Sequence, residues 1–293
     1  MTDWVEVIVS VGAADVDDVA ALTASEVSAA SAGTEQRGDE VVFWVASDTA
    51  AAALQETRDA VTRWQAGGLA VDPARVRLAT AMPEAEWRDA WKRYFKITRL
   101  TRQFVVVPSW EMHTHRPGDV VIDLDPGMAF GTGTHASTRL VLEELQDLAD
   151  REITPTRILD VGCGSGILAI AAVKRWPSAT CIAVDNDPIA VDATTDNAAI
   201  NRVADRISAS TTTLDQLDEE FPLVLANIQA HVLRALLPLL VARTAPGGTL
   251  ILSGLLTPQA EPLANEFVAA GMRIVRVRAS TDDAAWSAVT LTH

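Results

Sequence analysis

The sequence predicts an α/β fold built on a doubly wound, mostly parallel seven-stranded sheet, with a small N-terminal α+β domain before it. Two observations predict the sheet. Short apolar runs alternate with helical patterns from residue 157 onward, and the first run leads into a glycine-rich turn at residues 162–166. Near-continuous apolar strands are typical of parallel sheets, which are buried on both faces. A third observation, the order strand-helix-strand-helix-strand before residue 80, predicts the separate antiparallel domain.

We expect three parts: residues 1–81 form the small domain, 82–100 a linker helix region and 101–293 the large domain. Three aromatic residues between 87 and 95 recur every four positions, which is typical of an apolar stripe that packs a helix against a neighbour. The small domain is expected to contain strands at 3–11, 40–46 and 74–80 and helices at 15–30 and 48–65.

The large domain is expected to begin with two short strands and a helix, at 104–107, 120–124 and 136–149. The alternating part then has strands at 157–161, 179–184, 206–209, 223–226 and 249–253. The helices that connect them are expected at 165–175, 188–201, 231–243 and 258–270. Two final strands, at 273–278 and 284–290, have no helix between them, which predicts an antiparallel hairpin at one edge of the sheet.

The composition limits the class of partner. The chain has 39 acidic and 24 basic residues among 293, a formal net charge of −15. This balance disfavours nucleic acid, because phosphate binding needs concentrated Lys and Arg. It favours a cationic partner through complementary fields, although solubility alone is an equal explanation.

The chain is expected to be cytoplasmic and outside any membrane. Its two cysteines, Cys163 and Cys181, do not form a disulfide framework. The N-terminus has no secretory pattern, and no apolar run is long enough to span a bilayer. His113 and His115 share a loop, but a metal site needs three or four ligands, so we expect no metal.

Side chains that follow parallel strands meet at one edge of the sheet, where ligands of such folds bind. Here these positions hold the glycine turn, Asp185 and Asn227. Asp185 lies about 20 residues beyond the turn, the spacing of a carboxylate that binds ribose hydroxyls. Asp185 is also placed to cap the helix that begins near Pro188, a role that Asp187 fills equally well.

The glycine turn fits two cofactors. Starting at Gly164, it matches the looser nicotinamide pattern through Gly166 and Ala169, but a lone match is weak. Asp160 precedes the turn at the end of its strand, and the fold ends in a hairpin instead of a second nucleotide-binding half. Both features resemble class I methyltransferases, in which Asp-x-Gly-x-Gly-x-Gly, here Asp160 to Gly166, is the first motif.

Upstream of this motif, residues 125–135 read DPGMAFGTGTH, rich in Gly and Thr around Phe130. Ordering such a run is costly, which favours a ligand-facing loop. This loop, residues 160–172 and Ala226-Asn227-Ile228 together resemble the ribosomal protein L11 methyltransferase family. The resemblance covers about residues 84 to 255 and is weaker in the first 80 residues.

The resemblance implies S-adenosylmethionine-dependent methylation of a large-subunit ribosomal protein, at lysine side chains and at the N-terminal amine, with the small domain recognising this basic substrate. By position, the resemblance assigns cofactor contacts to Thr138, Gly162, Asp185 and Asn227. From the motif and the loop that carry the resemblance, we also expect cofactor contacts at Asp160, Gly164, Gly166, Phe130, Gly131 and Thr132. Our own hypothesis is that Asn227 also orients the acceptor amine.

Several alternatives stay open. Asn227 is also explained as a turn residue and Thr138 as a helix-surface threonine, and neither His135 nor His231 is assigned as a base. The alternative functions are a lysine methyltransferase for a different basic protein, a small-molecule methyltransferase, a nicotinamide-dependent oxidoreductase and a cofactor-binding protein without enzymatic output.

Overall fold

The computed structural model describes residues 4–12, 16–30, 33–79, 96–108, 110–114, 116–124, 135–281 and 285–293. The chain divides into two compact units, Met1–Phe95 and Lys96–His293. The linker helix expected at 82–100 lies largely outside the described residues, and the strand β5 (Thr98–Arg99) occupies part of its C-terminal end.

The N-terminal unit is a four-stranded sheet in the order β2-β3-β1-β4, in which every neighbouring pair is antiparallel. The small α+β domain was therefore predicted correctly, apart from the three-residue strand β2. All three residues of β2 are exposed and polar, so they carry no apolar signal. The elements are β1 (Trp4–Ser10), α1 (Val16–Glu26), β2 (Glu35–Arg37), β3 (Glu40–Ala46), α2 (Ala50–Ala66) and β4 (Val76–Leu78).

The second unit begins with a small sheet in the order β5-β6-β7, in which β6 and β7 run parallel. Its longer strands, β6 (Phe104–Val107) and β7 (Val120–Asp123), lie where the sequence predicts them. The helix α4 (Ala136–Asp150) follows and contributes the buried residues Leu140, Val141 and Leu145 to the core.

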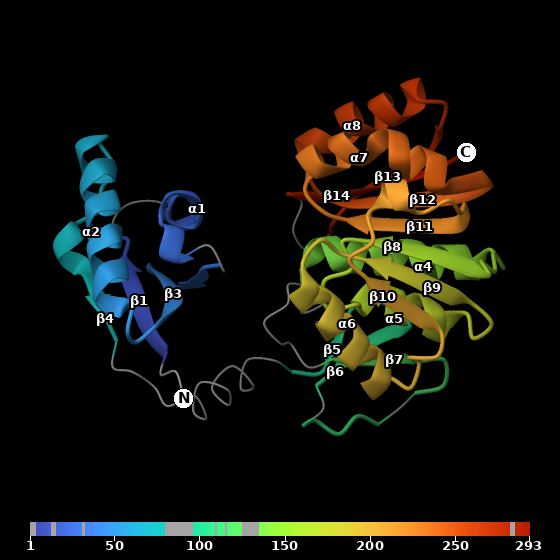
Figure 1. Ribbon diagram of the computed structural model, residues 1–293, viewed down its shortest axis with the longest axis horizontal. Coiled ribbons are helices and arrows are strands. Elements are labelled where there is room, and N and C mark those ends of the chain that lie inside the picture. Colours follow the sequence, from blue (N-terminus) through green and yellow to red (C-terminus); the bar gives the residue numbers. More distant parts are fainter. Residues whose placement is uncertain are drawn as a thin grey trace. The chain divides into compact units, whose positions relative to one another are not determined.

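A seven-stranded sheet in the order β10-β9-β8-β11-β12-β14-β13 dominates this unit (Figure 1). The first five strands in this order run parallel, and β14 and β13 are antiparallel to their neighbours. The predicted fold class and edge hairpin are therefore confirmed. The strands are β8 (Arg157–Val161), β9 (Thr180–Val184), β10 (Ile207–Ser210), β11 (Phe221–Asn227), β12 (Thr244–Leu256), β13 (Arg273–Ala279) and β14 (Trp286–Thr292).

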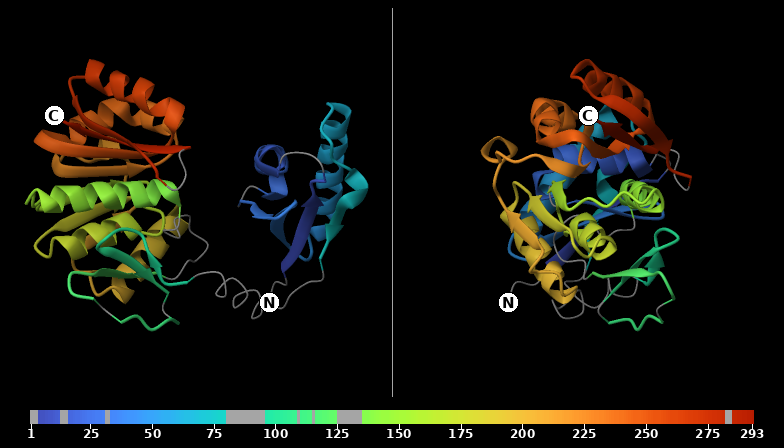
Figure 2. Two further views of the ribbon diagram at one scale, coloured as in Figure 1. Left: turned by 180° about the vertical axis from the view of Figure 1, so that it is seen from behind. Right: turned by 90° about the vertical axis from the view of Figure 1, so that its right-hand side faces the viewer.

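Helices cover both faces of this sheet (Figure 2). On one face α4 packs against α5 and α5 against α6, whereas α7 and α8 pack together on the other face over a large apolar cluster. The remaining helices of this unit are α5 (Ile167–Arg175), α6 (Pro188–Ile200), α7 (Ala230–Arg243) and α8 (Thr257–Ala269).

The strand register sets the position of the site. Val161 of β8 pairs with Val184 of β9 and with Ala226 of β11, and Val184 pairs with Ser210 of β10. Four parallel strands therefore end at one level, and the turns that follow them share one edge of the sheet. No helix of the described part of the chain is long and apolar enough to cross a membrane.

Ion pairs and a hydrogen bond hold α4 against β13 and β14, the antiparallel strands of the sheet. The buried Glu144 carboxylate pairs with Arg278 Nε of β13 at 2.7 Å and accepts a hydrogen bond from Thr290 Oγ1 of β14 at 2.8 Å. Asp147, one turn further along α4, pairs with Arg276 and Arg278. Because the first turn of α4 reaches the edge where the strands end, this network also positions that turn.

We predict that Arg278→Met lowers the free energy of unfolding by about 2–4 kcal/mol, because it leaves the Glu144 carboxylate buried with weaker pairing. The matched change Arg234→Met removes an ion pair with Glu266 whose side chains are both about 40% exposed. That control should lower the free energy of unfolding by less than about 1 kcal/mol. Urea unfolding of both variants makes the comparison, and equal losses would contradict the role assigned to Arg278.

Candidate functional site

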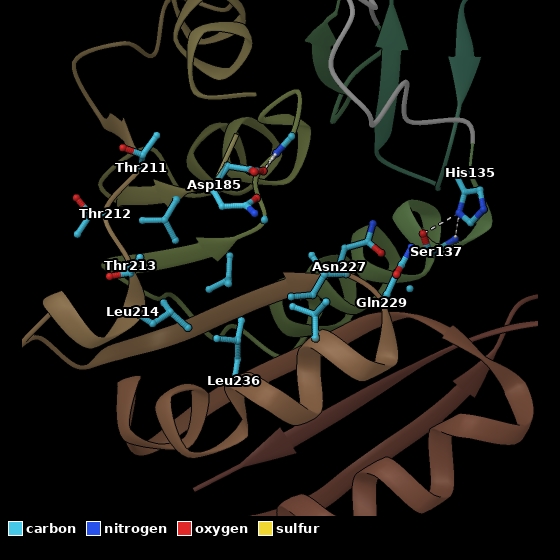
Figure 3. A pocket seen from close by; sticks show the side chains of 18 of the residues that line it. His135, Ser137, Asp185, Thr211, Thr212, Thr213, Leu214, Asn227, Gln229 and Leu236 are labelled. Atoms are coloured by element: carbon cyan, nitrogen blue, oxygen red, sulfur yellow. Dashed lines mark hydrogen bonds between the residues drawn. The ribbon is translucent and has the colours of Figure 1, made fainter. Parts of the chain in front are cut away.

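A pocket of about 630 Å³ opens at the edge where the parallel strands end. Figure 3 shows Asp185 and the segment from Thr211 to Leu214 at one end of it, and Asn227, Ser137 and His135 toward the other. Its lining mixes a few polar groups with a larger apolar surface, as is usual for small-molecule and cofactor sites.

The glycine turn forms one wall of this pocket. Its backbone is held from two sides: Gly162 N and Cys163 N donate to Val184 O at 2.8 and 3.1 Å, and Gly166 N donates to Cys163 O at 2.8 Å. These bonds join the turn to the end of β9 and close it at Gly166. Gly162 and Gly164 line the pocket.

Two of the glycines are required by lack of space. Gly162 has φ +72°, and a Cβ there would overlap the Ile228 side chain. Gly166 has φ +78°, and a Cβ there would lie 2.9 Å from Cγ2 of Thr194 on α6. Both φ values lie in the left-handed region that disfavours other residues. Gly162 thus allows close approach on the pocket side, and Gly166 allows close packing of α6.

Asp185 joins the turn to the next helix. One carboxylate oxygen accepts a hydrogen bond from Gly164 N at 3.0 Å, and the other accepts from Asp187 N at 3.1 Å. Asp187 itself caps α6 by accepting from Ile189 N at 2.9 Å. Asp185 is therefore not the helix cap, and its carboxylate lines the pocket beside the turn.

Asp160 lies behind the turn and is almost fully buried. Its Oδ2 accepts a hydrogen bond from Ala169 N at 3.1 Å, whereas Oδ1 is buried without a hydrogen-bond partner. Burial raises the pKa of this carboxyl to about 7, the Ala169 N–H lowers it, and the Asp185 carboxylate raises it. Burying a carboxylate with one unpaired oxygen is costly, which is why the neutral form of Asp160 is favoured.

At the other end of the pocket, Asn227 Nδ2 donates to the hydroxyl of Thr138 at 3.3 Å. Thr138 is buried in the first turn of α4, so it is not a surface threonine. His135 caps α4, because its Nδ1 accepts from Ser137 N at 3.2 Å. The His135 ring also packs edge-on against Trp286, with centroids 4.4 Å apart.

Sequence reasoning missed several residues that line the pocket. Thr211, Thr212 and Thr213 directly follow β10, so the strand-end rule that selected Asp185 would also have found them. Gly254 directly follows the strand predicted at 249–253, so the same rule would have found it as well. Trp286 lies on the antiparallel strand β14, whose register the sequence pattern leaves open, and no local signal marks its position.

Some predicted site residues are not described. Phe130, Gly131 and Thr132 lie outside the described residues, as does His115. His113 pairs with Asp119 at 3.2 Å. Within the described ranges, no group of three or more His, Cys, Asp or Glu side chains is arranged to hold a metal ion.

Comparison with known proteins relates the whole chain to one family. The family model described as ribosomal protein L11 methyltransferase (PrmA) matches residues 3–293. A protein of that name from Pelobacter propionicus is 38% identical over 275 residues, which cover 87% of each chain. A crystal structure titled ribosomal protein L11 methylase, from Lactobacillus delbrueckii subsp. bulgaricus, is 31% identical with a TM-score of 0.60, and it covers 67% of this chain and 98% of that one.

Shorter alignments reach higher identity. The relative of the same name from Trichlorobacter lovleyi is 46% identical over 204 residues, or 69% of this chain. The relative from Symbiobacterium thermophilum is 46% identical over 194 residues, or 66% of this chain. These two alignments span 66% and 60% of the relatives' own length.

We predict that Asp160→Asn changes how stability depends on pH. Between about pH 4 and 7 folded Asp160 retains a proton that the unfolded chain releases, so the wild-type protein loses stability as pH rises through this window. The variant has no carboxyl group to release this proton. Relative to wild type, its free energy of unfolding should therefore rise by roughly 1–3 kcal/mol between pH 5 and pH 8. Urea unfolding of the ligand-free proteins at both pH values tests this, with the exposed Asp196→Asn as control. Parallel profiles would contradict the raised pKa.

Proposed function

This chain belongs to the ribosomal protein L11 methyltransferase family, and from that premise we propose that it transfers methyl groups from S-adenosylmethionine to amino groups of ribosomal protein L11. The acceptors are lysine side chains and the N-terminal amine, and the reaction takes place in the cytoplasm. The observation that carries this proposal is the pocket that brings the glycine turn, Asp185 and Asn227 to one edge of the sheet.

The residues of the pocket fit the methyl donor. S-adenosylmethionine supplies a methyl group bonded to a positively charged sulfur. Asp185 would hold the ribose hydroxyls, and Gly162 and Gly164 let the backbone approach the donor closely. Apolar side chains of Val184, Leu214 and Leu236 offer a surface for a flat ring.

Other assigned contacts act less directly. Asp160 supports the turn from behind, because its carboxyl accepts a hydrogen bond from Ala169 N. Gly166 keeps the turn against α6, and Thr138 acts through Asn227. The family resemblance extends the assignment to Phe130, Gly131 and Thr132.

Asn227 is proposed to orient the acceptor amine. Its amide nitrogen is bonded to Thr138, so its amide oxygen is the group that would accept a hydrogen bond from a neutral amine. Such a bond directs the nitrogen lone pair along the line of transfer, in which the new N–C bond forms as the S–C bond breaks. Positioning of this kind supplies much of the rate enhancement in two-reactant sites.

The amine must lose a proton before the transfer. The ordinary pKa of a lysine is about 10.4, and burial in a pocket lowers it because desolvation disfavours the charged form. The pocket lining supports this step through its apolar surface, on which an ammonium ion is poorly solvated. Each methyl group that is added releases one proton to solvent.

The N-terminal unit is proposed to recognise the substrate protein. Every described residue that lines the pocket belongs to the second unit, so the pocket does not account for the fold of the first unit. The net charge of −15 favours a basic partner, as ribosomal proteins are.

We predict that Asp185→Asn weakens binding of S-adenosylhomocysteine by about 1.5–3 kcal/mol, which is the usual contribution of a hydrogen bond to a charged group. The change keeps an oxygen for the Gly164 N–H bond, so the turn should survive. Isothermal titration calorimetry measures the affinity. The control is Asp196→Asn, which removes an equal charge at an exposed position of α6. Equal affinities for wild type and Asp185→Asn would reject a ribose contact.

We also predict that the full chain labels purified ribosomal protein L11 when it is incubated with methyl-labelled S-adenosylmethionine, and that mass spectrometry finds the label on lysines and the N-terminus. Asn227→Ala should lower kcat by roughly tenfold to a hundredfold, because it removes a group that orients the amine. A ribosomal extract serves as a parallel substrate. Label on another protein but not on L11 would refute the proposed acceptor, and binding of NADH instead of S-adenosylhomocysteine would refute the chemistry.

A further inference from the structure

The helix α6 has a buried face that is unusual for a helix packed against a sheet. Its buried residues are Ala190, Thr194, Asn197 and Ala198, so the largest side chains on that face are polar. Thr194 and Asn197 are 0% and 4% exposed. Buried polar groups are retained where they make specific hydrogen bonds, and the partners of these two residues show what the face does.

Both side chains bond to the glycine turn. Thr194 Oγ1 donates to Gly164 O at 2.9 Å, and Asn197 Nδ2 donates to Ser165 O at 2.8 Å. These are the carbonyl groups of two consecutive residues in the turn. The N–H of Gly164 is held by Asp185, which lies at the start of the same connection. The peptide groups around Gly164 are thus fixed from both sides by residues between 185 and 197.

The residue that continues the buried face of α6, Asn201, bonds to a second segment of the chain, the end of β7. Asn201, which follows α6, accepts a hydrogen bond from Asp123 N at 2.9 Å and donates to Asp123 O at 2.5 Å. Its side chain therefore pairs with the backbone at the end of β7 as a neighbouring strand would. Residues 194, 197 and 201 lie on one side of a helical path, at spacings of three and four.

We propose that Thr194, Asn197 and Asn201 are positioning residues. Through their hydrogen bonds they hold the glycine turn and the end of β7 in the positions that the pocket needs to bind the methyl donor. None of the three lines the pocket, so each acts through the backbone that it holds. The inference rests on the proposed function, because it concerns the affinity of the same pocket for its cofactor.

The nearly isosteric Thr194→Val tests this role. It keeps Cγ2 and the shape of the side chain but removes the hydrogen bond from Oγ1 to Gly164 O. We expect the Kd for S-adenosylhomocysteine and the KM for S-adenosylmethionine to rise by about three- to tenfold, while kcat at saturating donor changes by less than about twofold. Thr194→Ser retains the hydroxyl and should restore most of the affinity.

Two matched controls separate positioning from stability. Thr195→Val removes a hydroxyl that bonds to Val191 O within α6 and is exposed. Thr244→Val removes a buried hydroxyl that bonds to Leu240 O at the opposite end of the parallel strands. Neither control should alter the Kd, although the second should lower the melting temperature as Thr194→Val does. Asn197→Leu provides a second removal at the turn, with the same expected rise in Kd.

The outcomes distinguish this inference from the proposed function. If wild-type protein does not bind S-adenosylhomocysteine, the proposed function fails. If wild type binds and both Thr194→Val and Asn197→Leu bind within twofold of it, the positioning role is wrong. A Kd that rises equally in Thr244→Val would also overturn it, because the effect would then follow stability alone.

Discussion

The site depends on the narrow space through which the glycine turn passes. Ile228, after β11, closes one side of the turn at Gly162, and Thr194 of α6 closes the other at Gly166. Gly254 of β12 is equally confined, because a Cβ there would lie 2.7 Å from Ile228 O. At Gly254 the neighbouring group is therefore backbone, whereas at Gly162 and Gly166 the side chains of Ile228 and Thr194 take up the space that a Cβ would need. A side chain at any of these positions would push the connections apart and change the shape of the pocket.

Much of the fold could be predicted from the sequence because its apolar residues follow the different spacings of helices and of buried strands. The buried parallel strands are mostly apolar and end at polar or glycine residues, which located Asp185 and Asn227 at one edge. The helix α6 was predicted, but its role at the turn was not. That role comes from Thr194 and Asn197, whose hydrogen-bond partners lie about 30 residues away in the sequence and are set by packing. Trp286 was missed for a related reason, since its place at the pocket follows from the antiparallel register of β14.

The electrostatics of the site combine two acids in different surroundings. Asp185 has its two oxygens satisfied by backbone N–H groups and remains in contact with the pocket. Asp160 is buried behind the turn with one oxygen unpaired, and its raised pKa reflects the cost of that burial. Such a cost lowers the stability of the ligand-free protein, and retaining it is typical of residues that serve a site. Of the two acids, only Asp185 is among the described residues that line the pocket.

The position of α4 has a consequence for how the protein is made. This helix begins at residue 136, yet the arginines that pair with its Glu144 and Asp147 are at 276 and 278, and the ring beside its capping histidine is at 286. A ribosome releases the helix more than a hundred residues before these partners. During that interval Glu144 lacks Arg278, the partner that its buried carboxylate has in the folded protein. The chain therefore acquires its complete pocket only after β13 and β14 have been synthesised and have joined the sheet.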